Sequence, residues 1–224
     1  MADRSADVAD VLVDADEAPA VPRRGLSALT AAVLAALLGL AVGFGAGAWL
    51  TQPDRPGHDS PEAGFARDMS VHHGQAVEMG MIAYDRASLA QTRVLGYDIA
   101  TTQQAQIGIM IAWLDKWGLP QSSRAPAMAW MPHGEHQLLA DGRMKGMASD
   151  DQIQALRKAQ GGEVDRLFAT LMIEHHRAGI HMAEAILDIT DDPDVRELAQ
   201  GMVTAQKSEI EALNGILSAV PATK

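Results

Sequence analysis

The sequence of 224 residues contains no cysteine. No disulfide can therefore hold its fold together, and no lipobox can attach the chain to lipid. Basic residues are also scarce, since 18 Lys and Arg face 29 Asp and Glu and give a formal net charge of -11. This charge and the lack of a basic stripe argue against a nucleic-acid partner. Stability must therefore come from an apolar core, alone or together with bound metal.

Charged side chains are also missing from residues 26–50. As a helix this stretch would be about 37 Å long, which is enough to cross a hydrocarbon core of about 30 Å. Arg23 and Arg24 precede it, so the positive-inside rule predicts a cytoplasmic N-terminus. A cleaved signal peptide is the alternative, because Ala46-Gly47-Ala48 resembles a small-residue cleavage site. The length of the run favours a single transmembrane anchor, and both interpretations export the rest of the chain.

The segments on either side of the apolar run have the composition of connectors. Residues 1–25 are acidic, rich in Asp and Ala and without apolar periodicity, which predicts a disordered cytoplasmic tail. Residues 51–61 contain Pro53, Pro56 and Gly57 and are expected to form a linker. A domain over residues 62–219 should follow.

The most informative pattern is a repeat at an offset of 103 residues. The string Met69-Ser-Val-His72-His73-Gly-Gln-Ala76-Val-Glu78-Met79 recurs as Met172-Ile-Glu-His175-His176-Arg-Ala-Gly179-Ile-His181-Met182. The same offset relates further identical pairs, among them Phe65/Phe168, Asp85/Asp188, Arg93/Arg196, Gln103/Gln206 and Ile107/Ile210. We infer that a segment of about fifty residues was duplicated together with a cluster of possible metal ligands.

Helix signals surround both copies of the repeat, and no strand signal is present. Ser60-Pro61-Glu62 supplies an N-cap, a proline at the first helical position and an acid in the first turn. The predicted helices run from there to about Ala90, from about Thr92 to Gly118, from about Glu163 to Ile189, and from Asp192-Pro193 to about Ala219. Two such αα-hairpins predict an all-α four-helix bundle with pseudo-twofold symmetry.

The two repeats, residues 62–118 and 163–219, are joined by a crossover over residues 119–160. This crossover is too long for a bare loop. The capping-box pattern Ser149-Asp-Asp-Gln152 predicts one further short helix within it.

One face of each repeated helix carries the candidate metal ligands. At 100° per residue, Met69, His72, His73 and Met79 fall within an arc of about 120°. The second copy presents the equivalent set, Met172, His175, His176 and Met182. Met69 lies three and four residues before the two histidines, so these three side chains can converge on one ion.

The chemistry of these ligands indicates a soft metal. Thioether and imidazole together select Cu(I) over magnesium or calcium. Zinc more often uses histidine with carboxylate or thiolate, and the nearby Asp68, Glu78, Glu174 and Glu184 keep zinc and Cu(II) open. A di-iron carboxylate centre is disfavoured, because neither histidine pair has a glutamate three residues before it.

The crossover offers additional ligands. His133 and His136 have the i,i+3 spacing of a chelate, and Pro132 before them indicates a loop rather than a helix. We expect them to form a mobile auxiliary metal site. Isolated methionines such as Met110 and Met202 are interpreted as core packing, because methionine at helical spacing usually fills a core.

The repeated strings, together with Gly146-Met147-Ala-Ser149-Asp-Asp-Gln152, resemble the bacterial family known as domain of unknown function 305 (DUF305). The resemblance covers about residues 62–219. It implies a ferritin-like helical bundle that is usually exported, with copper binding or copper tolerance proposed for some members. The chain departs from an even repeat at Gly179, which replaces Ala76, and at Gln106, which stands where the second copy has Glu209.

These observations predict an extracytoplasmic, membrane-anchored protein that binds copper, most readily Cu(I), for buffering, transfer or tolerance. No acid/base pair suited to catalysis is recognisable, which favours a binding protein over an enzyme. Two alternatives remain open at this stage: a metal-dependent oxidase, and a metal-free interaction module of a membrane complex. A homodimer or a membrane-protein partner is compatible with each of them.

Overall fold

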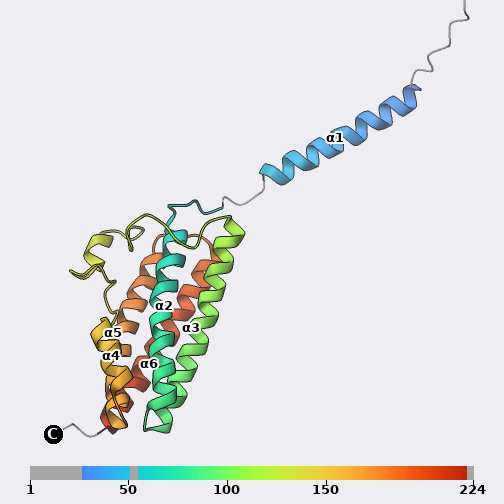
Figure 1. Cartoon of the computed structure of the whole chain (residues 1–224). Coiled ribbons are helices and arrows are strands. Elements are labelled where there is room, and N and C mark those ends of the chain that lie inside the picture. The colour runs from blue at the N-terminus through green and yellow to red at the C-terminus, as the bar shows by residue number, and fades with distance from the viewer. Residues whose placement is uncertain (1–26, 51–54, 221–224) are drawn as a thin grey trace, which may run out of the picture. The chain divides into compact units, whose positions relative to one another are not determined.

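The computed structural model describes residues 27–50 and 55–220, and every regular element in these ranges is a helix (Figure 1). The chain divides into two units, Met1–Pro53 and Asp54–Lys224. Two predicted segments lie wholly or partly outside the described residues. They are the tail, residues 1–25, and the first four residues of the linker, 51–54.

The first unit contains α1, Ala28–Leu50. Its segment Ala28–Gly45 is long and apolar enough to cross a membrane, and a signal sequence near an N-terminus has the same properties. The prediction of an export element is therefore compatible with this helix, whether it serves as an anchor or as a signal.

The second unit is a four-helix bundle of two αα-hairpins, which confirms the predicted all-α fold. One hairpin consists of α2, Pro61–Arg86, and α3, Ala90–Trp117; the other consists of α5, Gly162–Leu187, and α6, Pro193–Ala219. The crossover contains a short 3₁₀ helix, Gly134–Gln137, and α4, Asp150–Lys158, which packs on α2 and α5. Ser149 and Gln152 form the expected capping box at the start of α4. The prediction of a loop without helix after Pro132 is wrong, because the 3₁₀ helix lies there. A single tight turn of this kind can begin directly after a proline.

The ends of the bundle are closed by equivalent contacts of the two repeats. Asp165, in the first turn of α5, accepts hydrogen bonds from the backbone N–H groups of Ser88 and Leu89 at 3.0 and 3.1 Å. Glu62, in the first turn of α2, accepts the hydroxyl of Thr190 at 2.7 Å. Since the start of each helix contacts the turn that follows the other, α2 and α5 run antiparallel. Asp165 also explains why α2 ends at Arg86 rather than near Ala90, because it captures the backbone of the turn.

The apolar core consists of two clusters. A residue of one cluster corresponds to a residue of the other at the offset of 103. Phe65, Met69 and Met182 belong to one cluster, whereas Phe168, Met172 and Met79 belong to the other. Four buried histidines of α2 and α5 share the helix faces that line both clusters. We call these four side chains, His72, His73, His175 and His176, the imidazole layer.

The crossover is fastened to the bundle at two places. Asp68 of α2 accepts the backbone N–H of Met128 at 2.7 Å and the indole N–H of Trp130 at 2.9 Å. Gln75 of α2 bonds both the N–H and the carbonyl of Ala148, at 2.7 and 2.9 Å. Between these, Gly146 adopts a φ of 80° and packs so closely on α5 that a side chain there would collide with Ala178. The crossover thus covers the α2–α5 seam beside His175.

Candidate metal centre

The four repeated histidines are brought together in the interior of the bundle. His72, His73 and His176 are 0% exposed and His175 is 1% exposed. The rings of His72 and His175 are 3.7 Å apart between centroids and tilted by 31°. Within each adjacent pair the rings are more distant, 6.5 Å for His72 and His73 and 6.3 Å for His175 and His176. The duplicated motifs therefore build one layer rather than two separate surfaces.

Hydrogen bonds fix the tautomers of three of these rings. The Nε2–H of His73 donates to the amide oxygen of Gln106 at 2.7 Å, and the Nε2–H of His176 donates to the carboxylate of Glu209 at 2.6 Å. The Nε2–H of His175 donates to the backbone carbonyl of His72 at 3.0 Å. A neutral imidazole that donates through Nε2 keeps a lone pair on Nδ1, the usual arrangement of a metal-binding histidine with a second-shell acceptor.

The remaining imidazole nitrogens have no hydrogen-bond partner among the described residues. They are Nδ1 of His73, His175 and His176 and both ring nitrogens of His72. A buried polar atom without a partner costs free energy, and a cluster of five such atoms calls for a ligand. The residues present thus fit a metal ion that accepts imidazole lone pairs.

Three members of the imidazole layer, His72, His73 and His175, are held in their neutral form. Burial lowers the pKa of His72 and His175 well below 6.5, and mutual repulsion among the histidines lowers it further. The pKa of His73 falls to about 4 because burial outweighs the opposing hydrogen bond to Gln106. Neutral imidazoles are the form that binds metals, so these three side chains need little or no proton release at neutral pH.

The candidate methionines flank this layer on both sides and are buried. Met69 and Met182 share one apolar cluster, and Met79 and Met172 share the other. Among the residues that the structure describes, no three His, Asp or Glu side chains converge as ligands of one ion. A third ligand for an ion held by two imidazoles would therefore be a thioether or a histidine that moves.

The stack of His72 on His175 sets a further geometric condition. Two imidazoles on a shared tetrahedral ion keep their ring centroids roughly 5 Å apart, given metal–nitrogen bonds of about 2.0 Å. The observed separation is 3.7 Å. An ion that uses both rings must separate them, whereas an ion at Nδ1 of His73 or His176 need not.

The histidines outside the layer lie nearer the surface. His133 is exposed and lines a pocket of about 490 Å³ together with His181 of α5. The side chain of His136 lies outside the described residues, so its predicted pairing with His133 stays a prediction. His58 is next to Asp59 at 2.7 Å, in the segment before α2.

Sequence reasoning did not identify the polar partners of the layer. Gln106 and Glu209 were recognised only as an unequal pair of the repeat, yet each binds the second histidine of a motif. Gly179 also has no room for a side chain, because a Cβ there would come within 2.6 Å of the buried amide of Gln206. A shared spacing of 33 residues between each histidine and its partner could have suggested the contact.

Comparison with known proteins gives a consistent result. The family model described as "Domain of unknown function (DUF305)" matches residues 62–217. A DUF305 protein from Streptomyces coelicolor that is described as secreted has a crystal structure with a TM-score of 0.68 and 43% identity, covering 75% of this chain and 98% of that one. The Cu(II)-bound form of CopM matches with a TM-score of 0.57 and 27% identity, covering 70% of this chain and 96% of that one.

A curated relative matches over a shorter region. Uncharacterized protein L153 of Acanthamoeba polyphaga mimivirus is 36% identical over 53 residues, which is 24% of this chain and 35% of that protein. The match thus spans about a third of that relative's length.

Proposed function

Since this chain belongs to the DUF305 family, we propose that it binds copper in its imidazole layer and buffers the ion or passes it on. CopM, a solved structural neighbour at 27% identity, is described in a Cu(II)-bound form. That description supports copper as the metal here, and the chemistry of the layer supports where it binds.

The observation that carries the proposal is the set of buried imidazole nitrogens without partners. Three rings present Nδ1 lone pairs whose tautomers are fixed by Gln106, Glu209 and the carbonyl of His72. A purely structural role would leave these buried nitrogens unsatisfied, at a cost of roughly 1 to 3 kcal/mol each. Copper supplies an acceptor for these lone pairs when it is bound.

Within this proposal the ligands are the repeated histidines with the methionines on either side. They are Met69, His72, His73 and Met79 from α2, and Met172, His175, His176 and Met182 from α5. Buried thioethers beside neutral imidazoles favour Cu(I) over harder cations. The exposed His133, with His136, would serve as an outer auxiliary site.

The location of this activity follows from α1. We propose that α1 anchors the bundle to a membrane and that the bundle lies outside the cytoplasm. The helix has the length and apolar composition of a membrane span, and the relative from Streptomyces coelicolor is described as secreted. Copper held there would be an exchangeable cargo rather than a structural cofactor, because the bundle has two apolar clusters of its own.

Glu209→Gln should lower the affinity for copper by about 10- to 100-fold, the usual effect of removing a second-shell partner. The carboxylate accepts the Nε2–H of His176 and thereby makes its Nδ1 a better donor, whereas an amide oxygen is a weaker acceptor. Competition with a Cu(I) chelator of known affinity measures the change.

The matched control is Glu211→Gln, which removes an exposed carboxylate from the same helix. It should leave the affinity unchanged. Equal affinities for wild type, Glu209→Gln and Glu211→Gln would show that His176 is not a ligand.

A further inference from the structure

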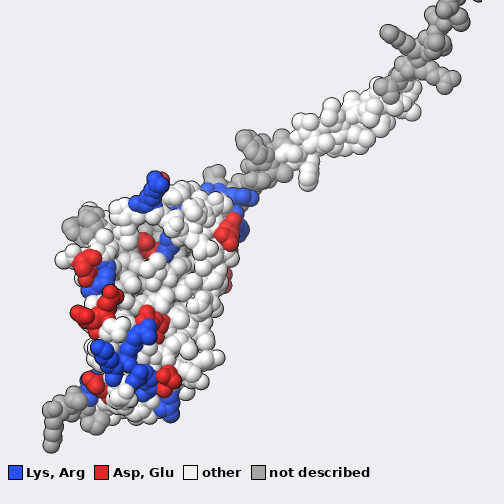
Figure 2. Space-filling view, in the orientation of Figure 1, with Lys and Arg blue, Asp and Glu red and all other residues white. Residues whose placement is uncertain are grey.

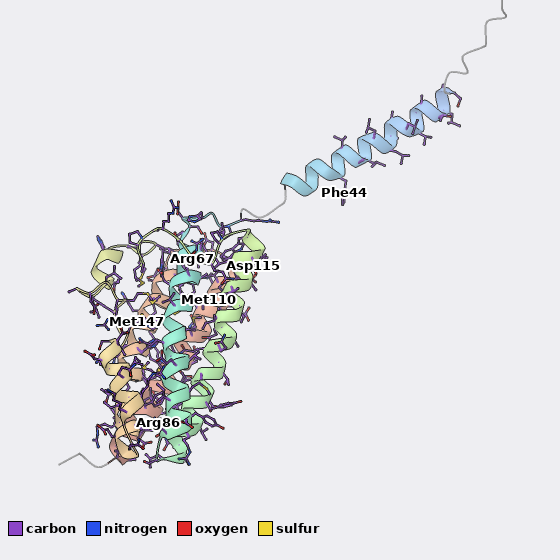
Figure 3. The ribbon with its side chains drawn as sticks, in the orientation of Figure 1. Phe44, Arg67, Arg86, Met110, Asp115 and Met147 are labelled. Atoms are coloured by element: carbon purple, nitrogen blue, oxygen red, sulfur yellow. The ribbon has the colours of Figure 1, made fainter. Side chains whose placement is uncertain are left out.

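Methionines are unevenly distributed about the imidazole layer. Among the described residues, seven are buried in one apolar cluster: Met69, Met110, Met128, Met131, Met144, Met182 and Met202. We call this the crossover side, because residues 128–144 of the crossover pack there, whereas α4 packs on the other cluster. The cluster on the other side contains two, Met79 and Met172. Figure 3 shows Met110 and Met147 in the half of the bundle that contains Arg67, away from Arg86.

The internal repeat shows that packing does not require this many thioethers. Met110 corresponds to Leu213 and Met202 corresponds to Ile99 at the offset of 103, and both of these residues lie in the opposite cluster. Leucine and isoleucine therefore fill the equivalent positions of the same fold. Side-chain packing alone therefore does not explain why Met110 and Met202 are methionines.

A pocket of about 380 Å³ opens onto the methionine-rich side. Met128 and Met182 line it from the cluster, and His181 and Glu174 line it from the exposed face of α5. Lys145 and Arg177 also line the pocket, and Arg177 is paired with Glu174. The soft groups His181 and Met182 lead inward, because Met182 shares a cluster with Met69 of the repeated motif.

The backbone at Met128 supports a role for its side chain. Met128 adopts a φ of 65°, in the left-handed region that costs a residue with a side chain about 1 to 2 kcal/mol. Asp68 holds its N–H at 2.7 Å, and Gly134 packs directly on its carbonyl. Strain that the surroundings maintain in this way is typical of functional positions.

We propose that the methionines on the crossover side form a relay site for soft monovalent metal ions, Cu(I) or Ag(I), between this pocket and the imidazole layer. The inference rests on the proposed function, because the imidazoles are the destination of the ion. An ion arrives beside His181, exchanges among neutral thioethers and reaches the Nδ1 lone pairs. Thioethers carry no proton, so this passage requires no proton release before the imidazoles.

The test is to replace Met110→Leu together with Met202→Ile, which installs the residues of the other repeat. Loading of the full-length protein with Cu(I) should slow by about tenfold, equivalent to an added barrier of about 1.4 kcal/mol. The final copper content should stay the same. Met128→Leu, which removes one thioether that lines the pocket, should also slow loading and provides a second variant if the first is unstable.

Ile99→Met with Leu213→Met is the matched control, since it adds two thioethers on the opposite side of the layer. It should not change the loading rate. The relay is wrong if the crossover-side variants load as fast as wild type, or if the control variant is slowed equally. Failure of the proposed function looks different, because the imidazole NMR signals of wild type would then not respond to copper at all.

A second inference concerns the outer face of α3 and does not depend on metal. Residues 99–114 of α3 carry no charged side chain, although about half of this stretch is exposed. The equivalent residues of α6, 202–217, include Lys207, Glu209 and Glu211. In Figure 2 the surface over α3 is largely without charged groups between its two ends.

Comparison of the repeats extends this contrast. Val94 and Tyr97 of α3 are 60% and 48% exposed, whereas Glu197 and Gln200 occupy the equivalent positions of α6. Gly108, in the middle of the stretch, has no atom within 4 Å of the position of a Cβ. A glycine inside a helix costs roughly 1 kcal/mol relative to alanine, and nothing in its own chain requires one here.

We propose that this face of α3 packs antiparallel against the same face of a second copy. Asp98 directly precedes the uncharged stretch, and Asp115 and Lys116 follow it. Asp98 and Lys116 lie on one face, because the separation from 98 to 116 is five turns of about 3.6 residues. A twofold axis at the height of residue 107 along the helix then places Asp98 of each copy opposite Lys116 of the other, as a self-complementary interface requires. Lys116 also lies 3.3 Å from Asp194 of its own chain, with both groups exposed.

Sedimentation of the full-length protein in detergent tests this pairing. Ala105→Glu, Asp98→Lys and Lys116→Asp should each weaken the dimer by about tenfold, since the first buries a charge in the apolar contact and the other two bring like charges together. The combination of Asp98→Lys with Lys116→Asp should restore it. Ser208→Glu, at the position of α6 equivalent to Ala105, is the control and should have no effect.

Dimerisation that is insensitive to Ala105→Glu would overturn the α3 interface. A double charge variant that remains as weak as the single variants would overturn the antiparallel register.

Discussion

Replacing His72 and His73 together by glutamine should remove nearly all tightly bound copper, although His175 and His176 remain. The reason is that the rings of His72 and His175 are 3.7 Å apart, so the two motifs supply one layer. The double replacement of His175 and His176 should have the same effect. Two independent sites would instead lose about half of the copper in each case, as expected for a duplicated ligand cluster with separate ions.

Copper content per chain after desalting measures this effect directly. His58→Gln is the control, because this histidine lies before α2 and its side chain is 47% exposed. Circular dichroism should show that the double variants keep their helices, since glutamine preserves much of the volume and polarity of imidazole. An unchanged copper content in both double variants would contradict the assignment of these histidines as ligands.

Acidification should strongly destabilise the metal-free bundle between pH 6.5 and 5. The pKa of His73 is lowered to about 4 by burial, and the pKa values of His72 and His175 are lowered well below 6.5 for the same reason. An unfolded chain binds protons at these histidines near pH 6.5, whereas the folded bundle does not. Their contribution to stability is therefore complete above pH 6.5 and is lost progressively as the pH falls toward the folded pKa.

The expected slope is steep because three histidines act in the same direction. Each contributes about 1.4 kcal/mol per pH unit below 6.5, so the free energy of unfolding should fall by up to about 4 kcal/mol per unit. Urea unfolding at several pH values above 5 measures the histidines separately from the carboxylates, which titrate at lower pH. Asp165 is one such carboxylate. Burial raises its pKa, but hydrogen bonds from Ser88 and Leu89 outweigh burial and lower it. His73→Gln should reduce the slope by about a third. A flat profile between pH 7.5 and 5 would show that these three histidines are not held neutral.

The fold could be predicted largely from local signals, whereas the polar contacts of the site could not. Ser60, Pro61 and Asp192 mark helix starts through their own backbone requirements, and the structure has these starts at the expected residues. The end of α2 differs from the prediction because it depends on Asp165, 77 residues further along the chain. Local periodicity contains no information about such a partner.

The same limit applies to the imidazole layer. Helical spacing placed His72 and His73 on one face, but the stack of His72 on His175 requires the antiparallel pairing of α2 with α5. The roles of Gln106 and Glu209 depend on how α3 and α6 pack beside these helices. Met110 and Met202 were interpreted as packing, and their concentration on one side of the layer became visible only when both repeats were placed in space.

The most direct test of the copper centre is anomalous diffraction at the copper absorption edge from crystals of the copper-loaded protein. The account predicts an anomalous peak between α2 and α5, at about 2.0 to 2.1 Å from an Nδ1 atom of His73, His175 or His176, with a methionine sulfur near it. Anomalous density found only at exposed groups such as His133 or His58, with an undisturbed stack of His72 and His175, would contradict it.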